Sequence, residues 1–351
     1  MPTYPIHNLS VESFGPFHSL DIKFSAGLNV IIGENAAGKT QLLKLLYSAT
    51  KALNPADSRS ESLTKKSLNI ALADKLMGVF RPDSLGRLTR RVRGQSRAEV
   101  EIKYSGIGQT FAFGFSSHAK KEVQTSSVPT TPLKDQPVFL PPQELLSLPN
   151  TFISMFDAYD TGFEETWRDT AELLWRPALR GPREKKASNL IVPILERLRG
   201  DVFEYQGRFY LKQQGVGNLE SALLADGHRK LAMLARLVAN GVLLEGGYLF
   251  WDEPEANLNP ALLQTVASVL LQLARNGVQI FVSTHSLYLL RELQMLSTDC
   301  SDVNPTYIGL IRKDDSEEDD VVAESRDDLD EISYVASFRA ELEQADRYLG
   351  W

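Results

Sequence analysis

One short stretch of the sequence has the residue types and spacing of a phosphate-binding loop. Residues 33–40 match the pattern G-x-x-x-x-G-K-[ST] at every fixed position. The glycines of such a loop let the backbone wrap a phosphate, and the N–H groups of the loop and of the next helix point at the anion. Lys39 would bridge the β- and γ-phosphate oxygens of a nucleotide, and the Thr40 hydroxyl would ligate Mg²⁺. The residues expected to contact the nucleotide here are Gly33, Glu34, Asn35, Ala36, Ala37, Gly38, Lys39, Thr40 and Gln41.

A second candidate site follows a short apolar run. Tyr248–Trp251 is typical of a buried strand, and Asp252 and Glu253 come directly after it. Beside a phosphate site, Asp252 would complete the Mg²⁺ shell and Glu253 would polarise the attacking water. By itself this ending could simply be the start of a loop. The phosphate-binding loop earlier in the chain favours the catalytic interpretation.

The elements around these residues form an alternating α/β pattern. Leu28–Ile32 predicts a buried strand that runs into the loop, and apolar residues at helical spacing follow the loop. Asn259 and Pro260 are a good N-cap and first residue for a helix after the carboxylates. Strands are then predicted at Val278–Ser283 and Tyr307–Arg312, with a helix between them.

The remaining chain is predicted to add antiparallel strands and a helical region. Alternating apolar residues indicate two strands before the loop, and two hairpins later in the chain. Residues 141–199 have a mostly helical pattern. The other predicted strands are Ile6–Val11, Leu20–Phe24, a hairpin within Ala98–Ser117, Val138–Leu140, and a hairpin that joins Val202–Tyr205 to Arg208–Leu211.

Composition restricts the class of protein. The chain has 351 residues, of which 43% are hydrophobic and 24% charged, as in ordinary globular proteins. No apolar run approaches the ~18–20 residues of a membrane-spanning helix, and the start lacks the basic and apolar regions of a signal peptide. Cys300 is the one cysteine, which excludes an internal disulfide framework. We therefore expect a cytoplasmic protein without a membrane partner.

Charge is distributed unevenly along the chain. The formal net charge is −7, so the chain as a whole is not a basic nucleic-acid binder. The segment Arg87–Arg97 nevertheless holds five arginines and no acid, which favours an anionic partner such as DNA. The segment Asp314–Glu331 holds eleven acids and one base, and it could dock a basic partner. A solvated loop followed by a packing helix over Ile332–Tyr348 is the simpler interpretation of that end.

The residues around the paired carboxylates resemble one family. Asp252–Pro260 is similar to the D-E-P-E-x-x-L-H-P stretch of RecF/SMC-like ATPases, which include the ATPase domains of OLD-family nucleases and of bacterial anti-phage systems. Asn259 stands where that family often has His. Ala256–Asn259 resembles the D-loop, which crosses a dimer interface. Transporter ATPases read E-P-T-S-A-L-D at this place, so the transporter alternative is disfavoured.

Three more segments share in this resemblance. The stretch 281–286 resembles the switch strand that ends in T-H-S, which implies that His285 contacts the γ-phosphate and helps to position the water. Gln143 stands roughly at the Q-loop position, where a glutamine joins the Mg²⁺ and water network. Ser13–Phe17 resembles the N-F-x-x-F segment near the nucleotide base. Without the resemblance, a histidine at a strand end or a glutamine in a loop would more often be structural.

The signature segment departs from the family pattern. Leu223–Leu231 opens a helix before the carboxylates, as the resemblance requires, but Ala225 replaces the serine of Leu-Ser-x-Gly. That serine normally bonds the γ-phosphate held by the opposite subunit, so its loss should weaken an ATP-bound dimer by ~1–3 kcal/mol. Gly227 and the helix start can still present N–H groups. Asp226 is expected to cap the helix. The nucleotide-contacting residues implied here are Ala225, Asp226 and Gly227.

The resemblance implies a fold and its lobes. The expected class is an α/β P-loop NTPase of ABC/SMC-head type, whose mixed sheet includes an antiparallel portion and which carries a helical lobe. The expected segments are an N-terminal ATPase lobe (1–136), a helical lobe or insertion (137–222), a C-terminal ATPase lobe (223–312), and an acidic segment with a C-terminal helix (313–351). The implied cofactors are ATP and Mg²⁺.

The resemblance also implies an activity. We expect an ATPase that acts as a head-to-tail homodimer, in which ATP binding closes the dimer and hydrolysis reopens it. No heptad tract for SMC arms and no Toprim-like acidic cluster is evident. The expected partner is therefore a separate effector, such as a nuclease or toxin, in bacterial anti-phage defence. Two alternatives stay open: a RecF-like DNA-binding repair ATPase, and an ATP-gated scaffold that does not hydrolyse.

Overall fold

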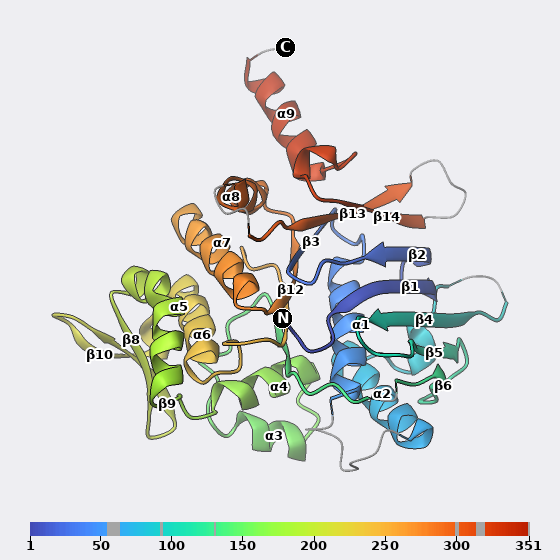
Figure 1. Cartoon of the computed structure of the whole chain (residues 1–351), viewed down its shortest axis with the longest axis horizontal. Coiled ribbons are helices and arrows are strands. Elements are labelled where there is room, and N and C mark those ends of the chain that lie inside the picture. Colours follow the sequence, from blue (N-terminus) through green and yellow to red (C-terminus); the bar gives the residue numbers. More distant parts are fainter. Residues whose placement is uncertain (55–63, 92–93, 130, 299–301, 314–319, 350–351) are drawn as a thin grey trace.

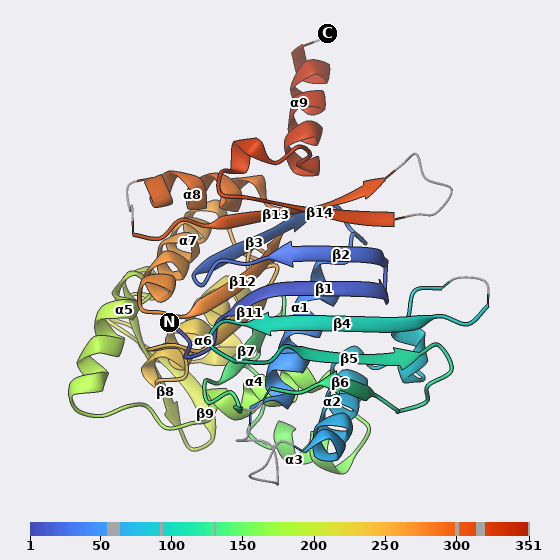
Figure 2. The same cartoon turned by 45° about the vertical axis from the view of Figure 1, so that its right-hand side comes forward.

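Two sheets packed against each other organise the protein. The computed structural model describes residues 1–54, 64–91, 94–129, 131–298, 302–313 and 320–349 (Figures 1 and 2). These ranges exclude Cys300, Arg93 and residues 314–319 of the acidic segment. Among the described residues, no helix has the length and apolarity needed to cross a membrane.

The central sheet has six strands and carries the predicted motifs. Its order is β14-β13-β3-β12-β11-β7, and the last five strands run parallel while β14 is antiparallel to β13. The strands are β3 (Leu28–Gly33), β7 (Pro137–Leu140), β11 (Tyr248–Asp252), β12 (Gln279–Thr284), β13 (Thr306–Lys313) and β14 (Asp320–Arg326). The three sequence segments 1–136, 137–222 and 223–312 each contribute strands to this sheet, so the proposed lobes share one framework.

The second sheet is antiparallel and comes from the first segment. Its order is β2-β1-β4-β5-β6. The strands are β1 (Ile6–Phe14), β2 (Phe17–Lys23), β4 (Arg97–Tyr104), β5 (Phe111–Ser116) and β6 (Gln124–Ser127). Helices α1 (Lys39–Ala52) and α2 (Lys65–Phe80) share a buried cluster with this sheet and with one face of the central sheet.

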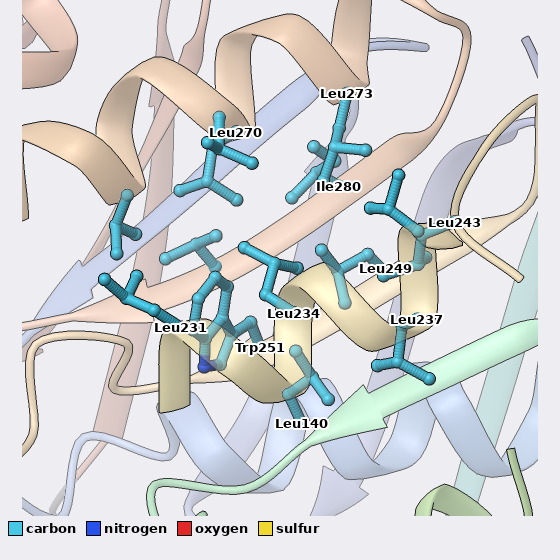
Figure 3. Packing of buried hydrophobic residues seen from close by; sticks show 14 of the residues in the cluster. Leu140, Leu231, Leu234, Leu237, Leu243, Leu249, Trp251, Leu270, Leu273 and Ile280 are labelled. Atoms are coloured by element: carbon cyan, nitrogen blue, oxygen red, sulfur yellow. The ribbon is translucent and has the colours of Figure 1, made fainter. Parts of the chain in front are cut away.

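Alternation along the central strands explains the layers. In β3, Ile31 joins the cluster that contains α1, whereas Val30 and Ile32 join the cluster on the opposite face. Because side chains alternate along a strand, a continuous apolar run buries both faces of a parallel sheet. Figure 3 shows the second cluster, where Trp251 of β11 lies among leucines of helices α6 (Asp226–Ala239) and α7 (Pro260–Arg275).

The other elements form a helical side and a C-terminal extension. Helices α3 (Phe152–Ala158), α4 (Glu165–Leu174) and α5 (Pro182–Leu198) lead to a small sheet of β8 (Gly200–Tyr205), β9 (Arg208–Gln213) and β10 (Gly217–Glu220). Helix α8 (Leu287–Thr298) follows β12, and helix α9 (Ala336–Leu349) projects from the body near the C-terminus (Figures 1 and 2). Short 3-10 helices lie at Leu85–Leu88, Ser221–Leu223 and Leu329–Glu331.

The structure confirms the α/β pattern and corrects its acidic end. The predicted strands and both hairpins are present, and the Asn259 side chain caps α7 by accepting a hydrogen bond from the Leu262 N–H at 3.0 Å. The expectation of a solvated loop was wrong for 320–326, which pairs with β13 because alternate residues such as Val321 reach the core. The packing helix predicted for residues Ile332–Tyr348 corresponds to α9. None of the described side chains of α9 is buried.

Candidate functional site

The loop between β3 and α1 has the conformation that its glycines predict. Gly38 adopts a φ of +93°, and a Cβ added to it would lie 2.5 Å from Phe17 Cζ and 2.7 Å from Pro16 Cγ. Only glycine fits there. The same contact places the turn 13–17 beside the loop, and a Cβ added to Gly15 would lie 2.0 Å from Gln41 Oε1. The turn that the resemblance placed near the nucleotide therefore borders the loop.

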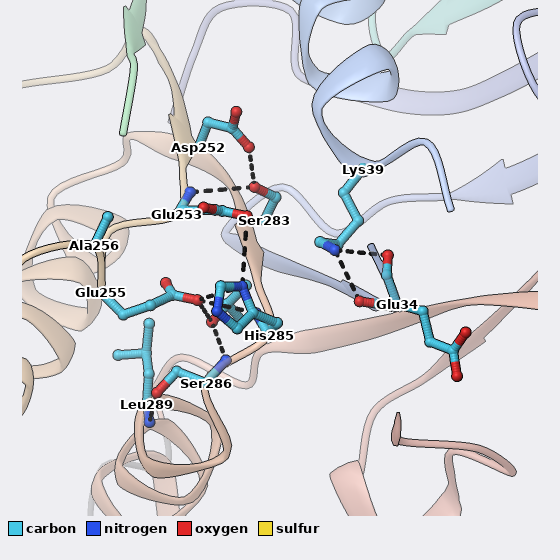
Figure 4. Close-up of polar contacts among 12 residues, drawn as sticks. Glu34, Lys39, Asp252, Glu253, Glu255, Ala256, Ser283, His285, Ser286 and Leu289 are labelled. Carbon is cyan, nitrogen blue, oxygen red and sulfur yellow. Dashed lines mark hydrogen bonds and ion pairs between the residues drawn. The ribbon is translucent and has the colours of Figure 1, made fainter. Parts of the chain in front are cut away.

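Lys39 lies inside this loop. Its Nζ donates to the carbonyl oxygens of Gly33 at 2.8 Å and Glu34 at 2.9 Å (Figure 4). Burial lowers the pKa of Lys39, while the nearby carboxylates of Glu253 and Asp252 act to raise it. A buried ammonium group held over a Gly-rich turn is suited to pairing with phosphate oxygens.

Asp252 and Thr40 meet at the edge of the central sheet. The Thr40 hydroxyl donates to the Asp252 carboxylate at 2.8 and 3.0 Å, and the Ser283 hydroxyl also donates to it. Burial raises the pKa of Asp252, while the hydrogen bonds from Ser283 and Thr40 lower it. Two of the three predicted metal ligands, Thr40 and Asp252, thus lie together and offer oxygen donors of the kind that Mg²⁺ prefers.

Glu253 and His285 face each other beyond Asp252. His285 Nδ1 lies 3.4 Å from Glu253 Oε1 and 3.4 Å from Glu255 Oε1. Glu253 has a φ of +45°, a strained left-handed conformation. Its backbone N–H donates to the Ser283 carbonyl at 3.1 Å, and this bond holds the turn against β12. The structure therefore brings together two of the three predicted catalytic residues, Glu253 and His285.

Glu255 also belongs to this cluster, although no role was predicted for it from the sequence. Its Oε1 accepts hydrogen bonds from the Thr284 hydroxyl at 2.7 Å and the His285 backbone N–H at 2.9 Å. Its Oε2 is buried and has no hydrogen-bond partner among the described residues. Glu255 therefore fixes the start of the segment that carries His285.

Lys230 is another residue of the site that the sequence analysis did not predict. It lies on α6 and is 2% exposed, and its Nζ donates to the carbonyl oxygens of Glu253 at 3.0 Å and Ala256 at 3.1 Å. Burial lowers the pKa of Lys230 to about 8, against the opposing effect of Glu255, Glu253 and Asp252. Its signal in the sequence was a lysine one residue before the apolar run of α6.

The signature segment starts α6 but is capped differently from the prediction. Ala225 is the N-cap residue and provides no side-chain hydrogen bond. The expectation that Asp226 caps the helix was wrong, because Asp226 is the first helical residue and its carboxylate pairs with Arg229. A Cβ on Gly227 would lie 3.0 Å from Leu258 Cδ2 and 3.1 Å from the Asn257 carbonyl. The glycine thus lets α6 approach the segment that resembles a D-loop.

Gln143 is at the sheet edge but not in the cluster. It follows β7, whose last residue Leu140 pairs in register with Trp251. Its side chain is exposed, and among the described residues it makes no hydrogen bond to Thr40, Asp252 or Glu253. Its role as a water or Mg²⁺ ligand stays a prediction.

The C-terminal segment approaches the phosphate-binding loop. The Tyr334 hydroxyl donates to Glu34 Oε1 at 2.7 Å. A pocket of about 410 Å³ is lined by Asn35 of the loop, by His285 and by the start of α9. The exposed residues of the loop therefore face α9 of the same chain.

Two families and two sets of known proteins are similar to this chain. Residues 8–136 match a family described as "AAA domain", and residues 150–291 match one described as "AAA domain, putative AbiEii toxin, Type IV TA system". The "DNA replication and repair protein RecF" of Clostridium botulinum (strain Eklund 17B / Type B) is 30% identical over 107 residues, which is 30% of each chain. RecF of Halalkalibacterium halodurans is 29% identical over 104 residues. The chain thus spans about 30% of the length of the first curated relatives.

Two solved structures share the whole fold. The Smc head domain with an extended coiled coil, bound to the C-terminal domain of ScpA from Pyrococcus furiosus, has a TM-score of 0.57 at 12% identity and covers 98% of this chain and 100% of its own. An SmcHead bound to the C-winged helix domain of ScpA has a TM-score of 0.56 at 13% identity and covers 92% of this chain and 97% of its own. At such identities the likeness concerns the fold.

Proposed function

We propose that this chain, which is similar to RecF proteins in sequence and to Smc heads in fold, binds and hydrolyses Mg-ATP in a head-to-tail homodimer and thereby controls a separate effector protein. The observation that carries the proposal is the cluster at the edge of the central sheet. Lys39, Thr40 and Asp252 lie there with Glu253 and His285, on three neighbouring strands and their loops.

The proposed reaction is the addition of water to the γ-phosphorus of ATP. Glu253 accepts a proton from the water, the bond between the γ-phosphorus and the bridging oxygen breaks, and ADP and phosphate leave. His285 keeps the Glu253 carboxylate oriented toward that water. Lys39 and the loop N–H groups hold the negative charge of the β- and γ-phosphates. When bound, Mg²⁺ would be held by Thr40 and Asp252 and would neutralise charge on the phosphate oxygens.

The dimer is proposed because the cluster is open on one side. Glu34, Asn35 and Ala36 are exposed, and the His285 side chain is 52% exposed. A γ-phosphate there would be covered when the start of α6 from a second copy closes over it, since a helix start offers N–H groups and the positive end of a dipole. Gln143 would enter the water network in this closed form.

The effector and the cellular role are the finer part of the proposal. We place the protein in the cytoplasm, in bacterial anti-phage defence, with a nuclease or toxin as the effector. The description of the family that matches 150–291 names a toxin and a toxin–antitoxin system, and both Smc heads are bound to a protein, ScpA. Both descriptions support a head that acts through another protein.

DNA binding is the second candidate, because the curated relatives are RecF proteins. The arginine-rich segment supports it less than its composition suggested. Arg90 is 8% exposed and donates to the Pro16 carbonyl, so it holds the turn beside the loop. Arg87 lies 3.6 Å from Asp83, and Arg97 pairs with Glu99. A DNA clamp would show an affinity that falls steeply with salt.

The first test is ATP hydrolysis by the purified chain together with its mass by light scattering. We expect Mg²⁺-dependent phosphate release, and a shift from lower to higher mass when ATP replaces ADP. DNA titrated at rising salt in the same samples separates the two candidates. Absence of both hydrolysis and ATP-dependent assembly would leave a nucleotide-gated scaffold, which is the remaining alternative.

Restoring the signature serine should strengthen assembly. In Ala225→Ser, the new hydroxyl at the N-cap of α6 can bond the γ-phosphate of the facing copy, and it can also cap its own helix. We expect ATP-dependent dimers to tighten by ~5–160-fold, which corresponds to about 1–3 kcal/mol. Ala225→Thr, a helix cap with an extra methyl group, is the control. Equal dimer affinity in wild type and Ala225→Ser would show that this position does not meet the phosphate.

A further inference from the structure

Helix α9 has little tertiary support. Its 14 residues, Ala336–Leu349, project from the body, and none of their described side chains is buried (Figures 1 and 2). Isolated helices of this length are marginal in water, because nucleation is costly and tertiary packing supplies most helical stability. A helix without such packing needs a surface that covers it.

The exposed face of α9 has a coiled-coil pattern. The apolar residues follow a 3-4-3-4 spacing, which is that of a and d positions in a heptad. They are Val335, Phe338, Leu342, Ala345 and Leu349. Phe338 is 45% exposed, Leu342 52% and Leu349 68%. The stripe is exposed from Phe338 onward, whereas Val335, just before the helix, is partly buried against the core.

Helix α8 contacts the first half of α9. Arg291 of α8 pairs with Glu341 at 2.9 Å, and its guanidinium lies 5.9 Å from the centre of the Phe338 ring. Tyr288 and Met295 lie one turn to either side of Arg291 and are 40% and 56% exposed. They extend the apolar surface from the stripe onto α8.

The charges beside the stripe are complementary to a second copy in one orientation. With Leu342 at an a position, Arg339 and Asp346 both occupy e positions. In an antiparallel pair of α9 helices, the e positions of the two copies face each other. Arg339 of one copy would then lie opposite Asp346 of the partner subunit, and two-fold symmetry gives two such contacts in each dimer. The same register packs Phe338 against Leu349 of the partner subunit. We propose that α9 pairs antiparallel with α9 of a second copy of this chain.

The segment that carries α9 links this contact to the nucleotide site. Ile332 is buried in the core, and the Ser333 N–H and hydroxyl donate to Glu324 Oε1 on β14 at 2.6 and 2.7 Å. Tyr334 then reaches Glu34, and Ala336 lines the pocket beside His285. The inference rests on the proposed function, in which a second copy closes over this loop. The α9 pair would help to hold the two copies together. This would compensate for Ala225, which replaces the family's serine and so removes one contact between the subunits through the γ-phosphate.

The experiment is light scattering of the full chain without nucleotide, across a range of concentrations. We expect wild type to dimerise, and Leu342→Asp to raise the dissociation constant at least ~10-fold, because each dimer loses two buried leucines. Val216→Asp is the matched control, since Val216 is 64% exposed in the turn between β9 and β10. It should dimerise as wild type does.

Charge reversal tests the register itself. Arg339→Asp alone and Asp346→Arg alone should each dimerise more weakly than wild type, because each places like charges opposite one another across the pair. Mixing these two variants should restore dimers, since every pair in the mixed dimer then has opposite charges. Restored dimers also show that both variants are folded.

Several results would overturn the inference. Wild type that is monomeric without nucleotide, or single reversals that dimerise as wild type does, would exclude the α9 pair. If ATP then still drives Glu253→Gln into dimers, only the α9 inference has failed. If the reversals act as expected but ATP adds no further assembly, the α9 pair stands and the ATP-dependent dimer has failed. A separate protein that occupies α9 and leaves the chain monomeric would also overturn the pairing.

Discussion

Glu253→Gln is expected to lower ATP turnover by a factor of about 10²–10⁴, the usual contribution of a positioned general base. Glutamine keeps the size of the side chain but cannot accept the proton of the attacking water. ATP binding should persist, because Lys39 and the loop are unchanged. The backbone carbonyl of Glu253, which accepts from Lys230, is unchanged as well. The variant should therefore accumulate as an ATP-bound dimer. Phosphate release measures the loss of turnover, and light scattering with ATP measures the dimer.

The control for this variant is Glu172→Gln, which neutralises an exposed glutamate that pairs with Arg168 on α4. Its turnover should equal that of wild type. If Glu253→Gln hydrolyses ATP within ~3-fold of wild type, the base is another residue, and Glu255 is the next carboxylate beside His285. A trapped dimer would also be the reagent with which to identify an effector that binds the ATP state.

Lys230→Met should lower the rate of ATP turnover about 10–100-fold, while the affinity for ATP changes little. A hydrogen bond from a charged donor contributes about 1.5–3 kcal/mol net. The variant loses two such bonds, to the carbonyl oxygens of Glu253 and Ala256. Those bonds hold the turn in which Glu253 keeps its φ of +45°. Without them, we expect the turn to relax and the carboxylate to leave its position beside His285.

Steady-state kinetics measures the loss of ATP turnover in Lys230→Met, and nucleotide titration measures its affinity for ATP. Lys186→Met removes an exposed lysine that pairs with Glu245 on the surface, and it should leave both quantities unchanged. A Lys230→Met protein that melts at a lower temperature but turns over normally would restrict Lys230 to a structural role. Loss of ATP affinity equal to the loss of turnover would mean that α6 positions the phosphate loop instead.

The sequence by itself determined the local motifs and their order. The loop 33–40 could be recognised because its glycines, lysine and threonine act within one turn of chain, and Gly38 shows the conformation that this requires. The strand before Asp252 could be recognised because a strand buried on both faces is apolar throughout. The order of these elements was enough to expect the α/β fold, since such patterns depend on neighbours in sequence.

The tertiary structure decided which distant side chains meet. Ser283 joins Asp252 only because β11 and β12 are neighbours in register. Lys230 reaches the Glu253 turn only because Gly227 lets α6 approach the chain at Asn257. A buried lysine and a strand serine have no local pattern that distinguishes them from ordinary residues, because their roles come from partners that the fold supplies.

The C-terminal end shows the same division. The acidic composition predicted a solvated loop, but residues 320–326 form strand β14 at the edge of the central sheet, with Val321 in the core. A composition average does not contain the alternation of buried and exposed side chains that makes this strand. The helical pattern of α9 was visible in the sequence, whereas its exposure was not. Whether an apolar stripe is covered depends on what lies opposite it. In the part of the chain that the structure describes, Val335 packs on the core and Arg291 of α8 lies against Phe338, while Leu342 and Leu349 are exposed.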